Sequence, residues 1–400
     1  MERKNLLSMG ILVVALILFS SMSSYSEEVR GVTDKSVKIG IICDLTGPST
    51  DAWTPITYGL KAYSKMINDR GGIHGRKINY IIEDDRYSIP LALSSFKKLV
   101  YRDKVFALLG PGSTGGTVAI IPLVEKEKIP LLANTSERRF LVPARKYIFS
   151  VLPCYQDQAK LALEYTFHDM KLKGPTIALM YPDMASGKTT RDAVRELVKV
   201  YPVKDYKEVI ISMAPLDYTS EVLRVKQSKP DIIYLFGFPA QAGLIVKTAR
   251  IHRLSTPIIV FQFGCTDETI KLAGKAATEF MGINCFGVWD DDSPGVKELR
   301  KVSLAYDPNV HYRDSNFFAG WLLGMIFYQS FKNAGRDLTR ETYLKGLEAV
   351  NFDTQGICGV ITFGPDDRKP IDSHRFFKAD IDKGEFVPIT GWRKPKKYDF

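Results

Sequence analysis

From residue 37 onward the chain alternates short apolar runs with stretches whose apolar residues recur at helical spacing. This alternation is typical of β-α units that build a mostly parallel sheet. Four runs in the first part are predicted strands, at 37–43, 77–83, 105–110 and 129–133. The stretches between them, "PITYGLKAYSKMIND" and "IPLALSSFKKLVYRD", are predicted helices.

A second series of the same kind follows an amphipathic segment at 155–170. Its predicted strands are 176–181, 208–212, 231–238 and 257–264, and its predicted helices are 186–200, 217–228 and 239–253. Helices at 294–306, 313–334 and 339–350 and extended segments at 359–364 and 375–380 are expected to supplement both series. We therefore predict two doubly wound α/β lobes joined by several crossings, which would form a hinge.

The first residues are predicted to be a secretory signal peptide. Arg3 and Lys4 precede an apolar run at 9–19, and small residues lead to Ser26. The basic start, the short apolar core and the small residues near the end are the three parts of such a signal. The apolar run is shorter than the roughly 20 residues that span a bilayer. We expect cleavage after residue 26 and export to the periplasm.

Composition adds few constraints. The 400 residues are 45% hydrophobic and 25% charged, which suits a large folded core and favours two lobes over one. The net charge is +10, but lysine and arginine are scattered along the chain, so no nucleic-acid partner is expected. The basic tail at 394–400 is expected to be a solvated end.

The five cysteines are widely spaced and include no CxxC pair, so the sequence indicates neither a zinc site nor a redox motif. No metal and no cofactor are expected. In an oxidising compartment Cys265 and Cys285 could form a bridge, although spacing alone does not set the connectivity.

The glycine-rich segment "LLGPGSTGGTVAI" at 108–120 is the strongest candidate for ligand binding. It follows a predicted strand, and ligands of open α/β sheets bind at the carboxyl ends of strands. Glycines around Ser113 and Thr114 let the backbone approach a ligand, and a helix start directs N–H groups at an anion. The alternative is a tight turn whose hydroxyl only caps the helix. A hydrolase nucleophile elbow is not favoured, because Pro111 stands where that motif has its first glycine.

The segment "DMASGKTT" ends like a nucleotide-binding loop, but Pro182 occupies the position of the first glycine of that motif. An ATPase or another enzyme is therefore not expected. The local alternative is a helix start with Ser186 as its N-cap and with Lys188 and Arg191 exposed.

Several motifs together resemble a known family. They are Thr46-Gly47-Pro48, "INDRGGIHGRKI" followed by Asp84-Asp85, "LLGPGSTGG…IPLLA", and the closing "DLTRETYLKGLEAVNFDT…GVITFGPDD…FVPITGW". The chain from about 32 to 393 is similar to periplasmic substrate-binding proteins of branched-chain-amino-acid-type ABC transporters, the leucine/isoleucine/valine-binding family.

This resemblance implies a type I periplasmic-binding-protein fold with a three-crossover hinge, a small-molecule solute between the lobes, and no catalysis. The expected lobes are 32–152 with 285–355 and 153–284 with 356–393. The expected partners are an inner-membrane permease and its separate cytoplasmic ATPase, and the receptor itself is expected to be a monomer.

The resemblance also implies a ligand site. Hydroxyl and N–H groups around Ser113 and Thr114, and the hydroxyls of Thr135 and Ser136, would hold a solute carboxylate. Phe238 is aromatic, as is usual in the family at the end of the strand at 231–238 in the second lobe. Ser186 stands where an aromatic residue is usual, and Gln262 where an acidic residue usually pairs with the ligand ammonium.

Two further residues have open interpretations. Glu137 could replace the lost acid or could face solvent. Trp53 could cover the apolar part of the solute, or it could be a surface-packed aromatic at a helix start. Phe263 and Tyr181 are weaker candidates for the wall of the site.

The expected function is an exported receptor that delivers a small carboxylate-bearing solute to an ABC importer. Candidate solutes are a branched-chain or other hydrophobic amino acid, or an organic or aromatic acid. The alternatives are a sensor for a membrane kinase or chemoreceptor, and a receptor for amides or urea-like solutes, with which the Gln262 amide could pair.

Overall fold

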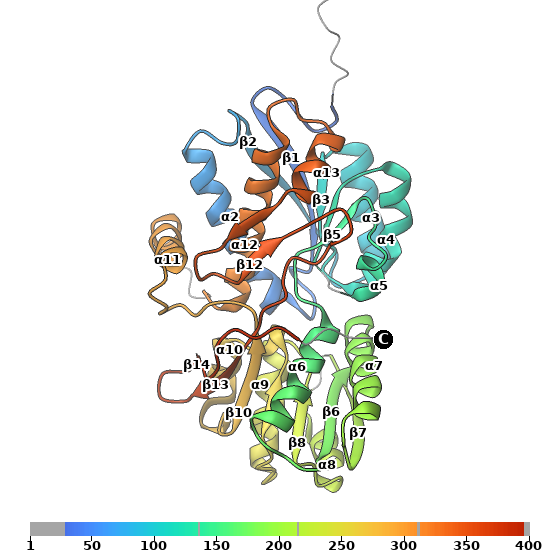
Figure 1. Ribbon diagram of the computed structural model, residues 1–400, viewed down its shortest axis with the longest axis vertical. Coiled ribbons are helices and arrows are strands. Elements are labelled where there is room, and N and C mark those ends of the chain that lie inside the picture. The colour runs from blue at the N-terminus through green and yellow to red at the C-terminus, as the bar shows by residue number, and fades with distance from the viewer. Residues whose placement is uncertain (1–28, 135–136, 214–215, 310–312, 396–400) are drawn as a thin grey trace, which may run out of the picture.

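The computed structural model describes residues 29–134, 137–213, 216–309 and 313–395. Within them the chain forms two α/β lobes, stacked along the long axis of the molecule (Figure 1). The expected signal peptide, residues 1–26, and the last residues of the basic tail lie outside the described residues. No helix in the described part of the chain is long and apolar enough to cross a membrane.

The first lobe contains a parallel five-stranded sheet with the order β2-β1-β3-β4-β5 in the described residues. Its strands are β1 (Ser36–Cys43), β2 (Lys77–Asp84), β3 (Ala107–Leu109), β4 (Leu131–Ala133) and β5 (Ile148–Ser150). The helices that connect them are α2 (Thr50–Asp69), α3 (Ile89–Lys97), which continues as a π-helix over Lys98–Arg102, α4 (Thr114–Glu127) and α5 (Arg138–Leu141).

The second lobe contains a seven-stranded sheet, as far as the described residues show, with the order β14-β13-β10-β9-β8-β6-β7. Its strands are β6 (Thr176–Pro182), β7 (Asp205–Ile211), β8 (Ile232–Leu235), β9 (Ile258–Val260), β10 (Phe280–Asn284), β13 (Arg375–Asp380) and β14 (Glu385–Pro388). Its helices are α6 (Tyr155–His168), α7 (Ala185–Val200), α8 (Thr219–Gln227), α9 (Pro239–Ile251) and α10 (Asp267–Ala273). Strands β13 and β14 pair antiparallel to their neighbours, so the C-terminal part of the chain completes this sheet.

The segment between β10 and β13 returns to the first lobe. It contains α11 (Pro294–Tyr306), α12 (Ser315–Ala334), α13 (Arg340–Glu348) and a hairpin of β11 (Asn351–Asp353) and β12 (Val360–Thr362). Helix α12 packs along α2, and the Phe363 ring contacts Phe149 of β5 at 5.2 Å between centroids. The lobe boundary that we expected at residue 356 falls between β11 and β12, which are the two strands of one hairpin.

The alternation of side chains along β1 explains why helices cover both faces of the first sheet. Ile39 and Ile41 point to the face covered by α2 and α12, whereas Ile42 packs with α3 and α4. Both faces are buried, which is the normal arrangement for a parallel sheet.

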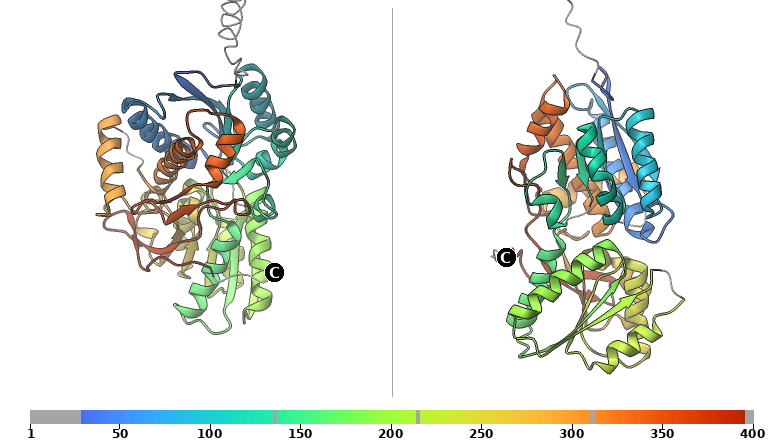
Figure 2. Two further views of the ribbon diagram at one scale, coloured as in Figure 1. Left: turned by 45° about the horizontal axis from the view of Figure 1, so that its top comes forward. Right: turned by 90° about the vertical axis from the view of Figure 1, so that its right-hand side faces the viewer.

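The predicted two-lobed α/β fold is confirmed. The described chain passes between the lobes three times, at 151–154, 285–293 and 363–374, and the right-hand view of Figure 2 shows the first lobe above the second. Several predicted strands are shorter than expected, and two of them end early at the edge that faces the first lobe. The run at 231–238 is a strand only to Leu235, and the run at 257–264 only to Val260, after which residues 262–264 form a 3-10 turn.

Candidate functional site

The glycine-rich loop leaves β3 at the edge of the first sheet that faces the second lobe. A Cβ atom on Gly110 would lie 1.9 Å from the carbonyl oxygen of Ile42, so only glycine allows the loop to pass this close to β1. Ser113 is the N-cap of α4, because its Oγ accepts a hydrogen bond from the Gly116 N–H at 2.9 Å. The capping interpretation is therefore confirmed for Ser113, and it leaves the hydroxyl proton available as a donor.

Two side chains from distant parts of the sequence hold this loop. Asp85 accepts hydrogen bonds from the Gly112 N–H at 3.1 Å and the Tyr87 N–H at 3.0 Å. The Trp53 indole N–H donates to the Gly112 carbonyl at 3.1 Å. Burial raises the pKa of Asp85 to about 6. Trp53 is 2% exposed, so it is a buried support of the loop and not a surface-packed aromatic.

Aromatic rings line the facing side of the second lobe. Tyr155, in the first turn of α6, contacts Phe236 edge to face at 5.6 Å, and Phe236 contacts Phe263 at 6.5 Å. Phe263 contacts Phe238, the N-cap of α9, at 5.6 Å. Phe236, Phe238 and Phe263 follow the carboxyl ends of β8 and β9, where ligands of α/β sheets bind.

The lobes touch directly at this edge. The Phe238 ring packs against Tyr87 of the first lobe at 6.1 Å between centroids. The Thr114 hydroxyl lies 3.3 Å from the Tyr155 hydroxyl. The Asp51 carboxylate in the first turn of α2 accepts the Ala240 N–H at the start of α9 at 2.8 Å. The described residues therefore form a closed arrangement. In it, the glycine loop faces an aromatic wall made of Tyr155, Phe236, Phe238 and Phe263, and the line of contact between the two lobes is called the seam.

The expected site residues differ in whether the structure describes them and in how close to the seam they lie. Thr135 and Ser136 lie outside the described residues. Ser186 is in the first turn of α7, whose N-cap is Met184, so the prediction of Ser186 as N-cap is wrong. Its side chain is buried, and its hydroxyl has no hydrogen-bond partner within the described residues. Burial raises the pKa of Tyr87, and the nearby Ser186 hydroxyl acts against that rise. Ser186 thus belongs to the seam between the lobes.

Glu137 does not face solvent, since it is 6% exposed. Arg139 pairs with it at 2.5 Å and 2.9 Å, so its charge is matched within its own lobe. Burial still raises the pKa of Glu137, and Arg139 acts against that rise. Glu137 also lines a pocket of about 510 Å³ between α5 and α7. The pocket is lined by Glu137, Arg138, Gln156, Thr189, Asp192, Ala193, Glu196 and Leu197.

The remaining candidates lie in the second lobe. Gln262 is 2% exposed and follows β9, and its side chain meets Gln158 of α6. Tyr181 lies within β6, where its ring contacts the Arg191 guanidinium and its hydroxyl lies 3.4 Å from Glu208. Lys188 is exposed, as predicted, and pairs with Asp183 at 2.9 Å. Arg191 was predicted to be exposed as well, but it is half-buried because its guanidinium packs over the Tyr181 ring.

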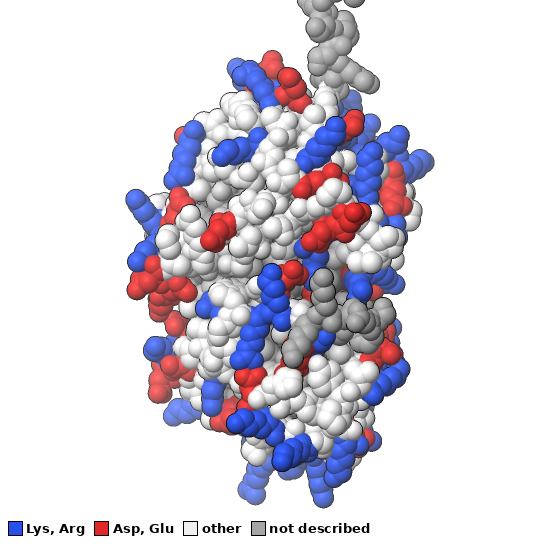
Figure 3. Space-filling model, viewed as in Figure 1, with Lys and Arg blue, Asp and Glu red and all other residues white. Residues whose placement is uncertain are grey.

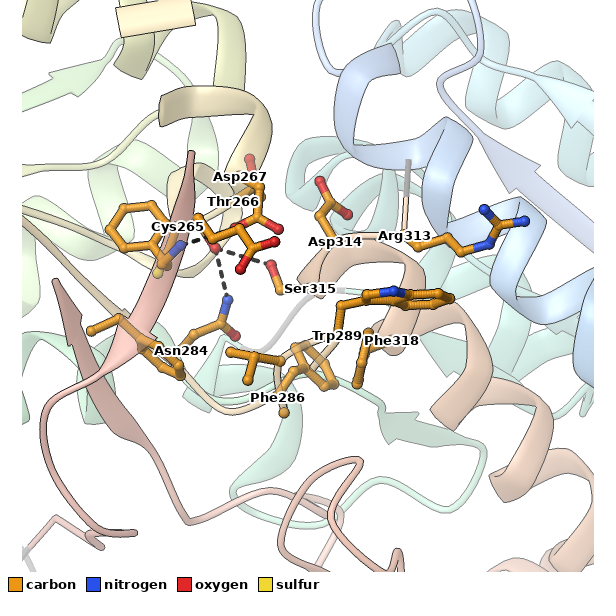
Figure 4. Close-up of a pocket in the computed structure, with 15 residues that line it drawn as sticks. Cys265, Thr266, Asp267, Asn284, Phe286, Trp289, Arg313, Asp314, Ser315 and Phe318 are labelled. Atoms are coloured by element: carbon orange, nitrogen blue, oxygen red, sulfur yellow. Dashed lines mark hydrogen bonds between the residues drawn. The ribbon is translucent and has the colours of Figure 1, made fainter. Parts of the chain in front are cut away.

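The bridge that Cys265 and Cys285 could have formed is not present, since all five cysteines are buried free thiols. Cys265 instead lies beside a small cavity of about 30 Å³ at the second crossing, which has room for only one or two water molecules (Figure 4). There its carbonyl oxygen accepts from Asn284 at 3.1 Å and from Ser315 at 3.0 Å, which ties α12 to the second lobe.

Sequence reasoning missed Tyr87, Tyr155, Gln158, Asp51 and the role of Asp85 in holding the loop. Asp84-Asp85 carried part of the family resemblance, so Asp85 had a signal. The others had none, because only the folded chain brings them to the seam. Charged side chains of both signs are interspersed over the face seen in Figure 3, in keeping with the scattered charge of the sequence.

A two-lobed α/β architecture whose lobes are joined by three crossings is that of a periplasmic binding protein. The chain belongs to this family: the family model described as periplasmic binding protein matches residues 36–385. The expected relationship to the leucine/isoleucine/valine-binding proteins is also confirmed.

Individual relatives are distant. A Leu/Ile/Val-binding protein of Rhizobium johnstonii is 24% identical over 222 residues, which are 55% of this chain and 59% of that protein. The structure of a branched chain amino acid ABC transporter protein from Thermus thermophilus with bound valine has 22% identity and a TM-score of 0.83, covering 91% of this chain and 97% of its own. A fatty acid ABC transporter substrate-binding protein from Thermomonospora curvata has 22% identity and a TM-score of 0.80, covering 92% and 95%.

Proposed function

We propose that the protein is an exported receptor that captures a small carboxylate-bearing solute between its lobes and delivers it to an ABC importer. The observation that carries this proposal is the meeting of Thr114, in the glycine loop of the first lobe, with Tyr155, in the aromatic wall of the second. A solute held by both lobes stabilises the closed form in proportion to its preference for that form.

The two sides of the seam suit two parts of one solute. The start of α4 supplies backbone N–H groups and the positive end of a helix dipole, and the Ser113 and Thr114 hydroxyls lie beside it. This combination favours an anion. Phe236, Phe238 and Phe263 supply an apolar surface. The valine bound in one structural neighbour and the fatty acid in the name of the other are both carboxylates with apolar tails, which supports a solute of the same general form.

The partners follow from this role. A signal peptide cleaved after residue 26 would release the receptor into the periplasm, where its closed form would dock on an inner-membrane permease served by a cytoplasmic ATPase. Mass spectrometry of the solute that co-purifies with the protein, followed by a thermal-shift panel of amino acids and organic acids, tests the proposal. A solute at 100 times its Kd should stabilise the protein by about 2.7 kcal/mol. If nothing co-purifies and nothing in the panel stabilises the protein, the proposal fails.

Replacing Thr114 tests the position of the carboxylate. Thr114→Ala removes a hydroxyl beside the start of α4, and we expect the free energy of binding of the identified solute to weaken by about 1.5–3 kcal/mol, as for hydrogen bonds to charged groups. Titration calorimetry measures the change. Thr33→Ala, at the exposed amino end of the same sheet, is the matched control and should leave the affinity unchanged. Equal affinities for both variants would place the carboxylate elsewhere.

A further inference from the structure

Two buried glutamines form a directional pair on the second-lobe side of the seam. The backbone N–H of Gln262 donates to the Gln158 Oε1 at 3.1 Å. The Gln158 Nε2 in turn donates to the Gln262 Oε1 at 3.4 Å. Each residue is 2% exposed, so neither amide has bulk water as an alternative partner. The pair is therefore a fixed part of the protein interior.

The backbone sets the orientation of both amides. The oxygen and nitrogen of a glutamine amide have nearly the same shape, so a pair of such groups could in general be turned either way. A backbone N–H can only donate, however, which requires the oxygen of Gln158 to face Gln262. The Gln158 NH₂ group then requires the oxygen of Gln262 to face Gln158. The Gln262 NH₂ group is the last group in this series of hydrogen bonds, and it can only donate.

This terminal donor has no partner within the described chain. The Gln262 Nε2 is buried without a hydrogen-bond acceptor among the described residues. A buried donor left without an acceptor is unfavourable, and such groups in native proteins usually mark a bound water, an ion or a ligand. A bound solute with a suitably placed oxygen would satisfy it.

The donor lies close to the groups that the proposed function assigns to the solute. Gln262 stands between Phe261 and Phe263 at the end of β9. Gln158 lies one turn after Tyr155 on α6, and residues three apart share a helix face. Tyr155 contacts both Thr114 and Phe236. Gln262 thus belongs to the same segment as Phe263 of the aromatic wall, and Gln158 to the same helix face as Tyr155.

We infer that Gln262 donates a hydrogen bond to the solute, so that the solute carries an oxygen acceptor in addition to the carboxylate that the glycine loop is proposed to hold. The solute class is a small 2-oxo or 2-hydroxy carboxylic acid with an apolar side chain. This inference rests on the proposed function, and it makes Gln262 the residue that excludes α-amino acids. An ammonium group has three donors and no acceptor, so it would meet the Gln262 NH₂ donor to donor.

Two other acidic groups near the seam differ in how far their oxygens already have partners. Glu137 is paired with Arg139. The Asp51 Oδ2 receives the Ala240 N–H, although its Oδ1 is buried without a hydrogen-bond partner among the described residues. Asp51 is therefore the one competing site for an ammonium group that the test has to separate from Gln262.

Leucine and its 2-oxo analogue, 4-methyl-2-oxopentanoate, differ in the substituent on the α-carbon, which is an ammonium group in the first and a carbonyl oxygen in the second. They therefore make a matched pair of probes. Calorimetry with the full mature protein should show at least tenfold tighter binding of the 2-oxo acid. Gln262→Glu keeps an oxygen toward Gln158 and replaces the donor by a carboxylate oxygen. It should weaken the 2-oxo acid at least tenfold and improve the affinity for leucine. Gln227→Glu, at an exposed position of α8, is the control and should change neither.

Tighter binding of leucine to the unmodified protein would overturn the inference while leaving the proposed function intact. An α-amino acid that co-purifies with the protein would also overturn the inference. Leucine binding that is abolished by Asp51→Asn would overturn it as well, since this result would place the ammonium group at Asp51. A co-purifying acid with a 2-oxo or 2-hydroxy group would support the inference even if both probes bind weakly. Failure of every solute to bind would remove the proposed function and this inference together.

Discussion

Two opposing influences act on the pKa of the Asp314 carboxyl group. Its Oδ1 caps α12 by accepting the Asn316 N–H at 3.0 Å and the Phe317 N–H at 3.3 Å, which favours the charged form. Burial, followed by repulsion from Asp267 of the second lobe, has the larger effect and raises the pKa of Asp314 to about 7. Figure 4 shows Asp314 and Asp267 at the same small cavity.

The stability of the protein should therefore depend on pH through this residue. An aspartate has a pKa of about 3.9 in an unfolded chain. Between about pH 4 and pH 7 the folded form thus keeps a proton that the unfolded form has lost, so the free energy of unfolding falls as the pH rises, by up to about 1.4 kcal/mol per pH unit. Asp314→Asn retains the cap without the charge, and it should raise the melting temperature more at pH 8 than at pH 5.

Thermal unfolding at both pH values measures this difference. Asp337→Asn, at an exposed site of the same lobe, is the control and should give no such pH dependence. A stabilisation by Asp314→Asn of the same size at pH 5 and pH 8 would show that Asp314 does not titrate in this range.

At the scale of elements, the hydrophobic pattern predicts most of the β-α units because parallel strands and their helices carry continuous local signals. Strands β5, β10, β11 and β14 were not predicted, because each has only three to five residues and so carries little periodic signal of its own. The glycine loop was predictable from its composition. Its supports were not, because the contacts of Trp53 and Asp85 with Gly112 span 59 and 27 residues of sequence.

The Trp53 support of the loop can be tested by a substitution that keeps an aromatic ring in the core. Trp53→Phe keeps an aromatic ring in the first turn of α2 but removes the N–H that donates to the Gly112 carbonyl. One hydrogen bond contributes about 0.5–1.5 kcal/mol, so the affinity for the identified solute should fall about two- to twelvefold. Calorimetry measures this loss. Trp392→Phe, at a partly exposed tryptophan of the second lobe, is the matched control. An unchanged affinity for Trp53→Phe would mean that the loop holds its position through Asp85 alone.

The whole molecule closes through few direct contacts, which suits a receptor that must also open. One of these contacts joins Asp51 of α2 to the Ala240 N–H at the start of α9, where the helix dipole favours a negative charge. Because this contact exists only between the lobes, its loss should shift the equilibrium toward the open form and should leave each lobe intact. A receptor that closes less often binds its solute more weakly by the same factor.

Asp51→Ala should therefore change shape and affinity together. Small-angle X-ray scattering without solute should show a larger radius of gyration than for the unmodified protein, and saturating solute should restore the compact form. The affinity should fall by up to about tenfold, which corresponds to about 1.4 kcal/mol. Asp69→Ala removes an exposed ion pair with Lys65 at the other end of α2 and is the matched control. If Asp51→Ala weakens binding while the scattering of the solute-free protein stays the same, Asp51 acts on the solute itself rather than on closure, which would also bear on its role as a competing ammonium site.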